Sequence, residues 1–372
     1  MTSRERTLTA LRGGTPDRVP IWAWGVHPWL GPVDPSVQPV VDAYLERGDT
    51  IHWWSPGAGT FLTASDQVSA TAQTRPSELP EFDEHVVVYE TPAGELTQIN
   101  YASREGKPGY CKKHLLQTPE DAQKLLSIPY VPPRPDCSTF FSLQDELGDA
   151  GVLMVAVPSD PMYALNNLTG SETFAIWSIE ERGLIRELVG EFARRIVDWV
   201  EWALSQGVGP LFGYVGPELC IPPLQSPADF EELVVGPNRQ VNDIIRAGGG
   251  IAFVHCHGRM DPVLEGFVRM HCDALHPIEP PPVGDVTMRQ AKARVGRDLC
   301  IVGNIQAHDV DIMAPRRFRD LVRQAVEEGM RGGGFILSPT ATPFDWPTMT
   351  DRARENWLAM LEVGLQVGRY SG

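Results

Sequence analysis

Two histidines separated by one residue are the most distinctive chemical feature of the sequence. His255 and His257 lie at the end of an apolar run and are followed by Gly258. In an extended chain, residues two apart face the same side, so both imidazoles can reach one ion. Neutral imidazole nitrogen binds Zn²⁺ well, and catalytic zinc sites add a further donor such as a carboxylate. The alternative is structural, with one histidine bonded to backbone and the other in solvent.

Glu279 is the candidate third ligand. It follows the next apolar run, in a proline-rich segment at residues 277–285. Prolines stiffen such a loop, so the carboxylate can be held toward one point with little loss of entropy. We therefore expect His255, His257 and Glu279 to bind Zn²⁺.

Further polar and aromatic side chains follow other apolar runs. Tyr214, Glu218 and Asn304 are candidate catalytic residues, because a hydroxyl, a carboxyl and an amide can move protons or orient a substrate. The candidate substrate contacts are Trp22, Trp24, His27, Trp54, Gln306 and Thr340, with Trp53 as a further possible wall of an aromatic pocket. Tryptophans in strands also pack in cores, and loop carboxylates are often solvated, so structural roles compete with these assignments.

Eight short apolar runs read as strands, and most of these candidate residues lie in them or follow their ends. They span residues 19–24, 50–54, 152–157, 210–215, 251–255, 273–276, 299–303 and 334–338. Helical periodicities separate most of them, as at residues 184–204 and 318–330. This alternation predicts an α/β fold with parallel strands, and eight strands favour a (β/α)8 TIM barrel over an open doubly wound sheet. Active sites of such barrels lie at the C-terminal strand ends.

A long stretch at about residues 55–150 separates the second and third predicted strands. It exceeds the length of one βα unit, and residues 85–89 and 95–101 flank a turn sequence at Pro92, Ala93 and Gly94. This pattern is typical of a β-hairpin. We expect a hairpin insertion over one barrel mouth, within a single domain that spans residues 1–372.

Composition excludes several classes of protein. The 372 residues carry a formal net charge of −16 without a basic cluster, which argues against nucleic-acid binding and against an anionic membrane surface. No apolar run reaches the roughly 18 to 20 residues of a membrane span, and the N-terminus lacks a signal-peptide core. Six widely spaced cysteines indicate reduced thiols. We expect a cytoplasmic enzyme that acts on a small molecule.

Several motifs resemble the uroporphyrinogen decarboxylase superfamily. They lie, in the order of that family, at residues 4–13, 16–20, 170–174, 216–218, 255–258, 278–285, 303–304 and 336–339. The resemblance covers nearly the whole chain and implies a (β/α)8 barrel and a homodimer. Function within this superfamily divides between porphyrinogen decarboxylases and zinc-dependent methyltransferases that act with corrinoid proteins.

Two departures favour the methyltransferase branch. The resemblance leads us to expect an arginine-rich motif after the first strand of true decarboxylases, and residues 22–27 read Trp-Ala-Trp-Gly-Val-His instead. Methyltransferases typically show His-x-Cys after the fifth strand, Glu after the sixth and Cys after the eighth. Here His255 and Glu279 match, whereas His257 and Thr340 stand where the thiolates are expected.

Two imidazoles and one carboxylate leave zinc a stronger Lewis acid that prefers an oxygen ligand. We therefore expect a methyltransferase or O-demethylase component that moves a methyl group between a small methoxylated substrate, aromatic or aliphatic, and a corrinoid protein. Cobalamin would arrive on that separate protein, because the chain has no DxHxxG corrinoid-binding motif. The alternatives are a zinc-dependent hydrolase or lyase, a decarboxylase, and a non-catalytic binding barrel.

Overall fold

A curled parallel sheet of seven strands forms the centre of the protein. The computed structural model describes residues 1–56, 67–344 and 348–370. The strands follow the order β1-β6-β7-β8-β9-β10-β11. They are β1 (Thr50–Trp54), β6 (Gly151–Ala156), β7 (Leu211–Val215), β8 (Ile251–His255), β9 (Ala274–His276), β10 (Cys300–Ile305) and β11 (Phe335–Pro339). Each strand pairs with the next one of the sheet along the chain, which leaves β1 and β11 at the edges.

The segment at residues 19–24, expected to be the first strand, forms only an isolated bridge between these edges. Ile21 pairs in parallel with Leu337 of β11, and the N–H of Asp49 donates to the carbonyl of Ile21 at 2.8 Å. A longer strand is interrupted because Pro20 has no N–H and the N–H of Ile21 donates to the carboxylate of Asp49. The curled sheet with this bridge is consistent with a TIM-like barrel.

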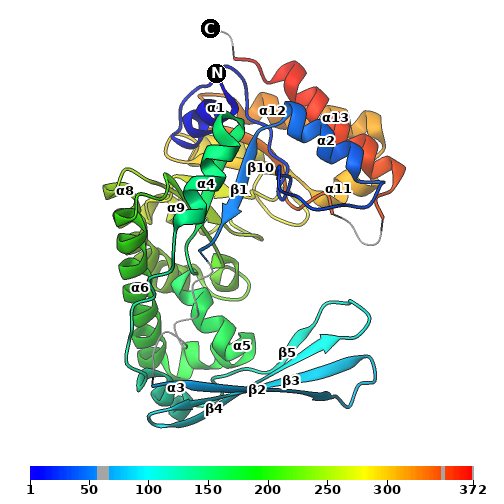
Figure 1. Cartoon of the computed structure of the whole chain (residues 1–372). Coiled ribbons are helices and arrows are strands. Elements are labelled where there is room, and N and C mark those ends of the chain that lie inside the picture. The colour runs from blue at the N-terminus through cyan, green and yellow to red at the C-terminus, as the bar shows by residue number, and fades with distance from the viewer. Residues whose placement is uncertain (57–66, 345–347, 371–372) are drawn as a thin grey trace.

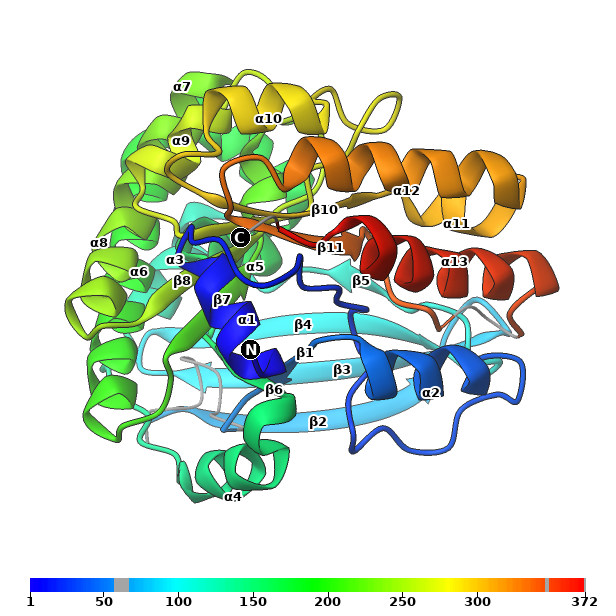
Figure 2. The same cartoon turned by 90° about the horizontal axis from the view of Figure 1, so that it is seen from above.

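The helices lie mostly around the parallel sheet, whereas the one at residues 119–126 packs against a strand at residues 94–103. They are α1 (Ser3–Leu11), α2 (Gln38–Arg47), α3 (Pro119–Leu126), α4 (Ser138–Leu147), α5 (Pro161–Glu180), α6 (Arg182–Ser205), α7 (Pro227–Phe230), α8 (Gly236–Ala247), α9 (Leu264–Arg269), α10 (Met288–Arg294), α11 (Ala307–Ile312), α12 (Pro315–Gly329) and α13 (Asp351–Val367). Short 3-10 helices lie at η1 (Gly148–Ala150) and η2 (Pro217–Cys220), and a π-helical turn at η3 (Glu231–Val235). Seen from above, α2, α8, α10, α12 and α13 lie around the parallel strands (Figure 2).

Alternate residues of the strands face the interior of the curled sheet. The interior cluster contains Ala10, Leu11, Trp22, Ile51, Val152, Met154, Leu211, Ile251, Phe253, Ala274, Cys300, Val302 and Ile336. Intervening strand residues such as Phe212 and Val254 belong to the second cluster, which packs under the helices. Because the period along a strand is two, this alternation decides which side chains at the strand ends point into the mouth.

The insertion between β1 and β6 is a four-stranded antiparallel sheet, not the single hairpin that we expected. Its strands are β2 (Ser69–Pro76), β3 (Phe82–Thr91), β4 (Gly94–Ser103) and β5 (Tyr110–Lys113). The pair β3 and β4 contains the predicted hairpin, and β2 and β5 extend it on both sides. Every residue of β2 is exposed, so the strand shows no apolar alternation that could predict it. Residues 57–66 of the insertion lie outside the described residues.

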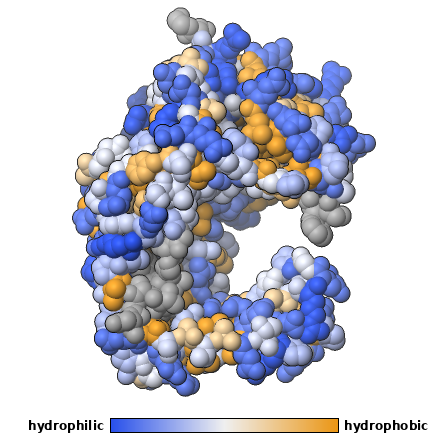
Figure 3. Space-filling view, in the orientation of Figure 1, coloured by the Kyte–Doolittle hydropathy of each residue, from blue (hydrophilic) through white to orange (hydrophobic). Residues whose placement is uncertain are grey.

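The molecule has the shape of a letter C (Figure 1). The long helices α5 and α6 lie between the parallel sheet and the insertion sheet, and β1 points from the end that holds both termini toward the insertion sheet (Figure 1). The space-filling view shows an open cleft between these two parts (Figure 3). The C-terminal ends of the parallel strands therefore face this cleft. The single-domain assignment for residues 1–372 stays a prediction.

In the part of the chain that the structure describes, no helix is both long and apolar enough to span a bilayer.

Candidate active site

Two buried histidines at the ends of neighbouring strands form the base of the site. His255 of β8 is in register with His276 of β9, and their Nδ1 atoms lie 2.9 Å apart. The Nε2 atom of His276 lies 3.1 Å from the carbonyl oxygen of Pro339, at the end of β11. Burial lowers the pKa of His255 to about 2 and that of His276 to about 3. Both rings are therefore neutral near pH 7.

His257 and Glu279 form a second pair just beyond the strand ends. Nδ1 of His257 lies 3.2 Å from Oε1 of Glu279, and Oε2 of Glu279 accepts from the N–H of Gly258 at 2.7 Å. Burial works against both charges, but the Glu279 carboxylate raises the pKa of His257, and His257 together with Gly258 lowers the pKa of Glu279. The pair therefore favours an imidazolium beside a carboxylate.

The structure brings the three expected zinc ligands together, but not as a metal-holding group. The rings of His255 and His257 have centroids 4.6 Å apart, as their spacing predicts. Among the described residues, no group of three or more His, Cys, Asp or Glu side chains could hold a metal ion as arranged. Nδ1 of His255 contacts His276, and both oxygens of Glu279 accept hydrogen bonds. The present arrangement does not fit a zinc ion, so zinc binding by these residues stays a prediction.

Glu218 provides a half-buried acid at the end of the neighbouring strand. It lies in η2, which follows β7 through Gly216 at a φ of 130°. A Cβ at Gly216 would lie 2.3 Å from Cβ of Tyr163, so only glycine allows this turn. Within the described residues, the buried Oε2 of Glu218 has no partner. Burial raises the pKa of Glu218, and nearby His257 offsets part of this effect.

Three tryptophans form a wall beside the histidines. Trp24 stacks between Trp22 and Trp53, with ring centroids 5.6 and 6.0 Å away. The rings of Trp24 and His255 meet edge to face at 4.5 Å. Trp54 lies on the other face of β1, where its Nε1 donates to the hydroxyl of Thr139 in α4. The alternation along β1 separates Trp53 from Trp54.

Two amide-bearing residues and a threonine line the ends of β10 and β11. The Nε2 group of Gln306 donates to Glu279 at 3.4 Å, and Oε1 of Gln306 accepts from the hydroxyl of Thr340 at 3.4 Å. The same Thr340 oxygen accepts from the N–H of Ala307. Gln306 and Thr340 thus orient Glu279. Asn304, in β10, is buried beside the same strand ends.

Two other candidates make different contacts. The hydroxyl of Tyr214 donates to Oδ1 of Asn242 in α8 at 3.1 Å, on the helix-facing side of β7. The ring of His27 packs against His52, with centroids 3.9 Å apart, and lies near Trp29. Burial lowers the pKa of both histidines, that of His52 to about 4.

Sequence reasoning did not single out Asp160 and His276, whose only signal was their position at strand ends. Asp160 follows β6 and caps α5 by accepting from the N–H of Tyr163 at 2.8 Å. It also accepts from the amide of Asn238. Burial raises the pKa of Asp160 to about 7, and the charge of Glu218 adds to this effect. A fully buried carboxyl thus lies next to the candidate acid.

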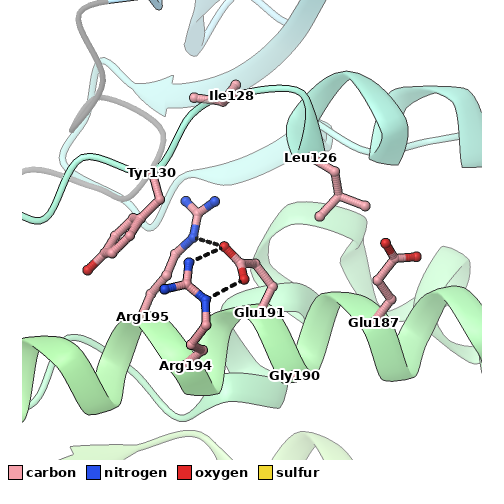
Figure 4. Close-up of a pocket in the computed structure, with 8 residues that line it drawn as sticks. All are labelled: Leu126, Ile128, Tyr130, Glu187, Gly190, Glu191, Arg194 and Arg195. Carbon is pink, nitrogen blue, oxygen red and sulfur yellow. Dashed lines mark hydrogen bonds and ion pairs between the residues drawn. The ribbon is translucent and has the colours of Figure 1, made fainter.

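A surface pocket beside α6 is lined by a network of ion pairs. It has a volume of about 590 Å³ and lies between α6 and the segment at residues 126–130 (Figure 4). Glu191 accepts hydrogen bonds from Arg194 and Arg195, and both guanidinium groups lie over the ring of Tyr130. Glu191 thus compensates part of the charge of the two arginines and holds both of them in place.

The chain belongs to the uroporphyrinogen decarboxylase (URO-D) family, whose family model matches residues 98–347. No curated protein matches the chain. Among solved structures, a methyltransferase from Methanosarcina mazei is similar over 97% of this chain and 98% of its own, with a TM-score of 0.61 and 13% identity. At this identity the likeness shows a shared fold. A structure assigned to a vitamin-B12 independent methionine synthase of Listeria monocytogenes aligns over 64% of this chain and 70% of its own, with a TM-score of 0.40 and 13% identity.

Proposed function

We propose that this chain is a methyltransferase of the URO-D family that moves a methyl group from a small methoxylated aromatic compound to a corrinoid protein. Family membership supports an enzyme. The shared fold with a methyltransferase, over nearly the full length of both chains, supports this branch. Cobalamin arrives on a separate protein in this proposal.

The observation that carries the proposal is an aromatic wall beside a half-buried acid, Glu218, whose Oε2 has no hydrogen-bond partner among the described residues. Trp24 and Trp53 present stacked rings, and aromatic stacking contributes about 0.5–1.5 kcal/mol beyond buried area. His255 lies against Trp24, and His257 lies against His255. Because Glu218 interacts with His257, the wall and the acid belong to one contiguous site. Such a site suits a flat ring that carries an oxygen substituent.

The reaction breaks the bond between the methyl carbon and the ether oxygen. Both electrons of that bond stay on the oxygen, and the reduced corrinoid supplies the electron pair for the methyl group. Glu218 in its protonated form donates a proton to the departing oxygen, which otherwise leaves as a costly anion. The tryptophan wall and the His257–Glu279 pair orient the substrate and limit access of water.

The decarboxylase alternative has weaker support. An acidic tetrapyrrole requires cationic side chains for its carboxylates, and the place of the arginine-rich motif holds Trp22 and Trp24. Both rings belong to the stacked tryptophan wall. This wall favours a neutral aromatic ring over a polyanion.

The test is a single-turnover reaction with free cob(I)alamin and a series of methoxybenzoates. We expect loss of the Co(I) absorbance together with an equal amount of the corresponding phenol. Release of methanol without a methylated corrinoid would favour the hydrolase alternative, and release of CO₂ would favour the decarboxylase.

The zinc prediction has its own test. Zinc binding requires the side chains of His255, His257 and Glu279 to rearrange, because as they lie they do not form a metal-holding group. If the prediction holds, titration of metal-free protein gives one equivalent of bound Zn²⁺, and His257→Ala abolishes this binding. His85→Ala, which changes an exposed histidine of β3, is the matched control. Failure of the unchanged protein to bind Zn²⁺ would end the prediction and leave the Glu218 assignment intact.

A further inference from the structure

We propose that His276 is a positioning residue that fixes His255 in one tautomer, with a proton on Nδ1 and a free lone pair on Nε2. The inference rests on the proposed function only for its catalytic meaning. The tautomer itself follows from three hydrogen-bonding groups at the ends of β8, β9 and β11.

The donor and acceptor of each hydrogen bond can be assigned by starting from Pro339. Its carbonyl oxygen can only accept, so Nε2 of His276, 3.1 Å away, must carry a proton. An imidazolium would be costly at a ring that is 0% exposed, so His276 is neutral and carries one N–H, which leaves its Nδ1 as an acceptor. The Nδ1 of His255 lies 2.9 Å from it and must therefore donate. His255 consequently keeps its lone pair on Nε2.

Packing prevents the rings of His255 and His276 from rotating. His276 is 0% exposed and His255 is 7% exposed. The two rings stack with centroids 5.1 Å apart, and Trp24 lies edge to face against His255 and tilted against His276. The ring of Trp22 packs against the ring of His276, and their centroids lie 5.5 Å apart. Rotation of either ring would need displacement of a tryptophan from a close-packed interior.

The consequence is a nitrogen lone pair whose position does not depend on solvent. The nitrogen that a histidine offers to a ligand or proton is set by the hydrogen bond that its other nitrogen makes. Here His255 donates that bond to a second histidine, and the second histidine donates in turn to a backbone carbonyl. The Nε2 atom of His255 is thus preset to accept a hydrogen bond or bind an electrophile when substrate arrives.

Nuclear magnetic resonance of protein labelled with ¹⁵N-histidine tests the tautomer directly. We expect His255 to show a protonated Nδ1 and an unprotonated Nε2 near pH 7, with its signals assigned by their loss in His255→Gln. The opposite tautomer in the unchanged protein, or a rapid mixture of both, would overturn the inference. This measurement requires no methyl transfer, so it is independent of the proposed function.

Two substitutions of His276 separate positioning from packing. His276→Asn places an amide oxygen where Nδ1 was and should keep the His255 tautomer, whereas His276→Phe fills the space but cannot accept, and should give a mixture. Unchanged His255 signals in a folded His276→Phe protein would contradict the inference. Should His276→Phe not fold, the unchanged protein and His276→Asn still decide it.

Discussion

Glu218 is the side chain whose loss should affect the chemistry most directly. Glu218→Gln keeps the shape and removes the proton, so we expect kcat to fall about 10²–10⁴-fold, the usual range for a general acid. The loss should be largest for methoxybenzenes whose phenols are least acidic, because their oxygen most needs a proton as it leaves. Rates across a series of ring substituents measure this dependence.

Glu187→Gln is the control for this substitution, because Glu187 is exposed on α6 far from the strand ends. It should leave the rates unchanged. If Glu218→Gln lowered every rate in the series by the same factor, Glu218 would be a structural residue and the assignment of the acid would be wrong.

The buried carboxyl of Asp160 should make the free energy of unfolding fall as the pH rises. Its pKa rises from 3.8 in an exposed chain to about 7 in the fold because it is buried, so the folded state holds the proton more tightly. The stabilisation is complete below pH 3.8 and is lost as the pH rises through about 7, by about 1.4 kcal/mol per pH unit. Asp160→Ser keeps the helix cap without the titration. Compared with this variant, the unchanged protein should lose free energy of unfolding between about pH 4 and 7, and a constant difference in urea titrations would contradict this account.

Part of the site could be predicted from residue types and spacing alone. The approach of His255 to His257 follows from their spacing in a strand, and Glu279 was expected near them because it follows the adjacent strand. The role of His276 could not be predicted, because it depends on the carbonyl of Pro339 in a strand much later in the chain. The hydrogen bond of Tyr214 to α8 likewise depends on how that helix packs.

At the scale of elements, Asp49 connects the segment at residues 19–24 to the start of β1. Its buried carboxylate accepts from Arg6 at 2.8 Å, from Arg18 at 2.7 Å and from the N–H of Ile21 at 2.9 Å. Asp49→Ala would leave charged donors without their partner, which typically costs about 3–5 kcal/mol. Urea unfolding measures this loss.

Asp17 gives a matched comparison for Asp49, because it also binds Arg6 but its side chain is 42% exposed. Asp17→Ala should cost less than about 1 kcal/mol, as expected for an exposed ion pair. Equal losses for Asp17→Ala and Asp49→Ala would show that the Asp49 network does not hold the segment at residues 19–24 in place.

Apolar runs predicted the parallel strands well because both faces of such strands are buried. The bounds of β1 and β8 match the predicted runs, and the other five runs differ by a residue or two. The segment at residues 19–24 has the same composition but pairs as an isolated bridge, since a carboxylate takes one of its N–H groups. Apolar runs could not predict the polar strand β2, because neither of its faces is buried.

At the scale of the whole molecule, the open cleft gives the strand ends a clear approach. The parallel sheet and the insertion sheet lie on opposite sides of the molecule's opening (Figure 1), which the space-filling view shows as a cleft (Figure 3). Transfer of a methyl group to a separate protein requires such access. The order of elements predicted the sheet that carries the site, whereas the C shape depends on how α5 and α6 extend from it.

The most direct measurement follows both atoms of the bond that breaks. A substrate with ¹³C in its methoxy carbon and ¹⁸O in its ether oxygen is incubated with the protein and cob(I)alamin, and the products are analysed by mass spectrometry. The account predicts that ¹³C appears on the corrinoid and that all ¹⁸O stays in the phenol. Recovery of ¹³C as free methanol, with no label on the corrinoid, would contradict it.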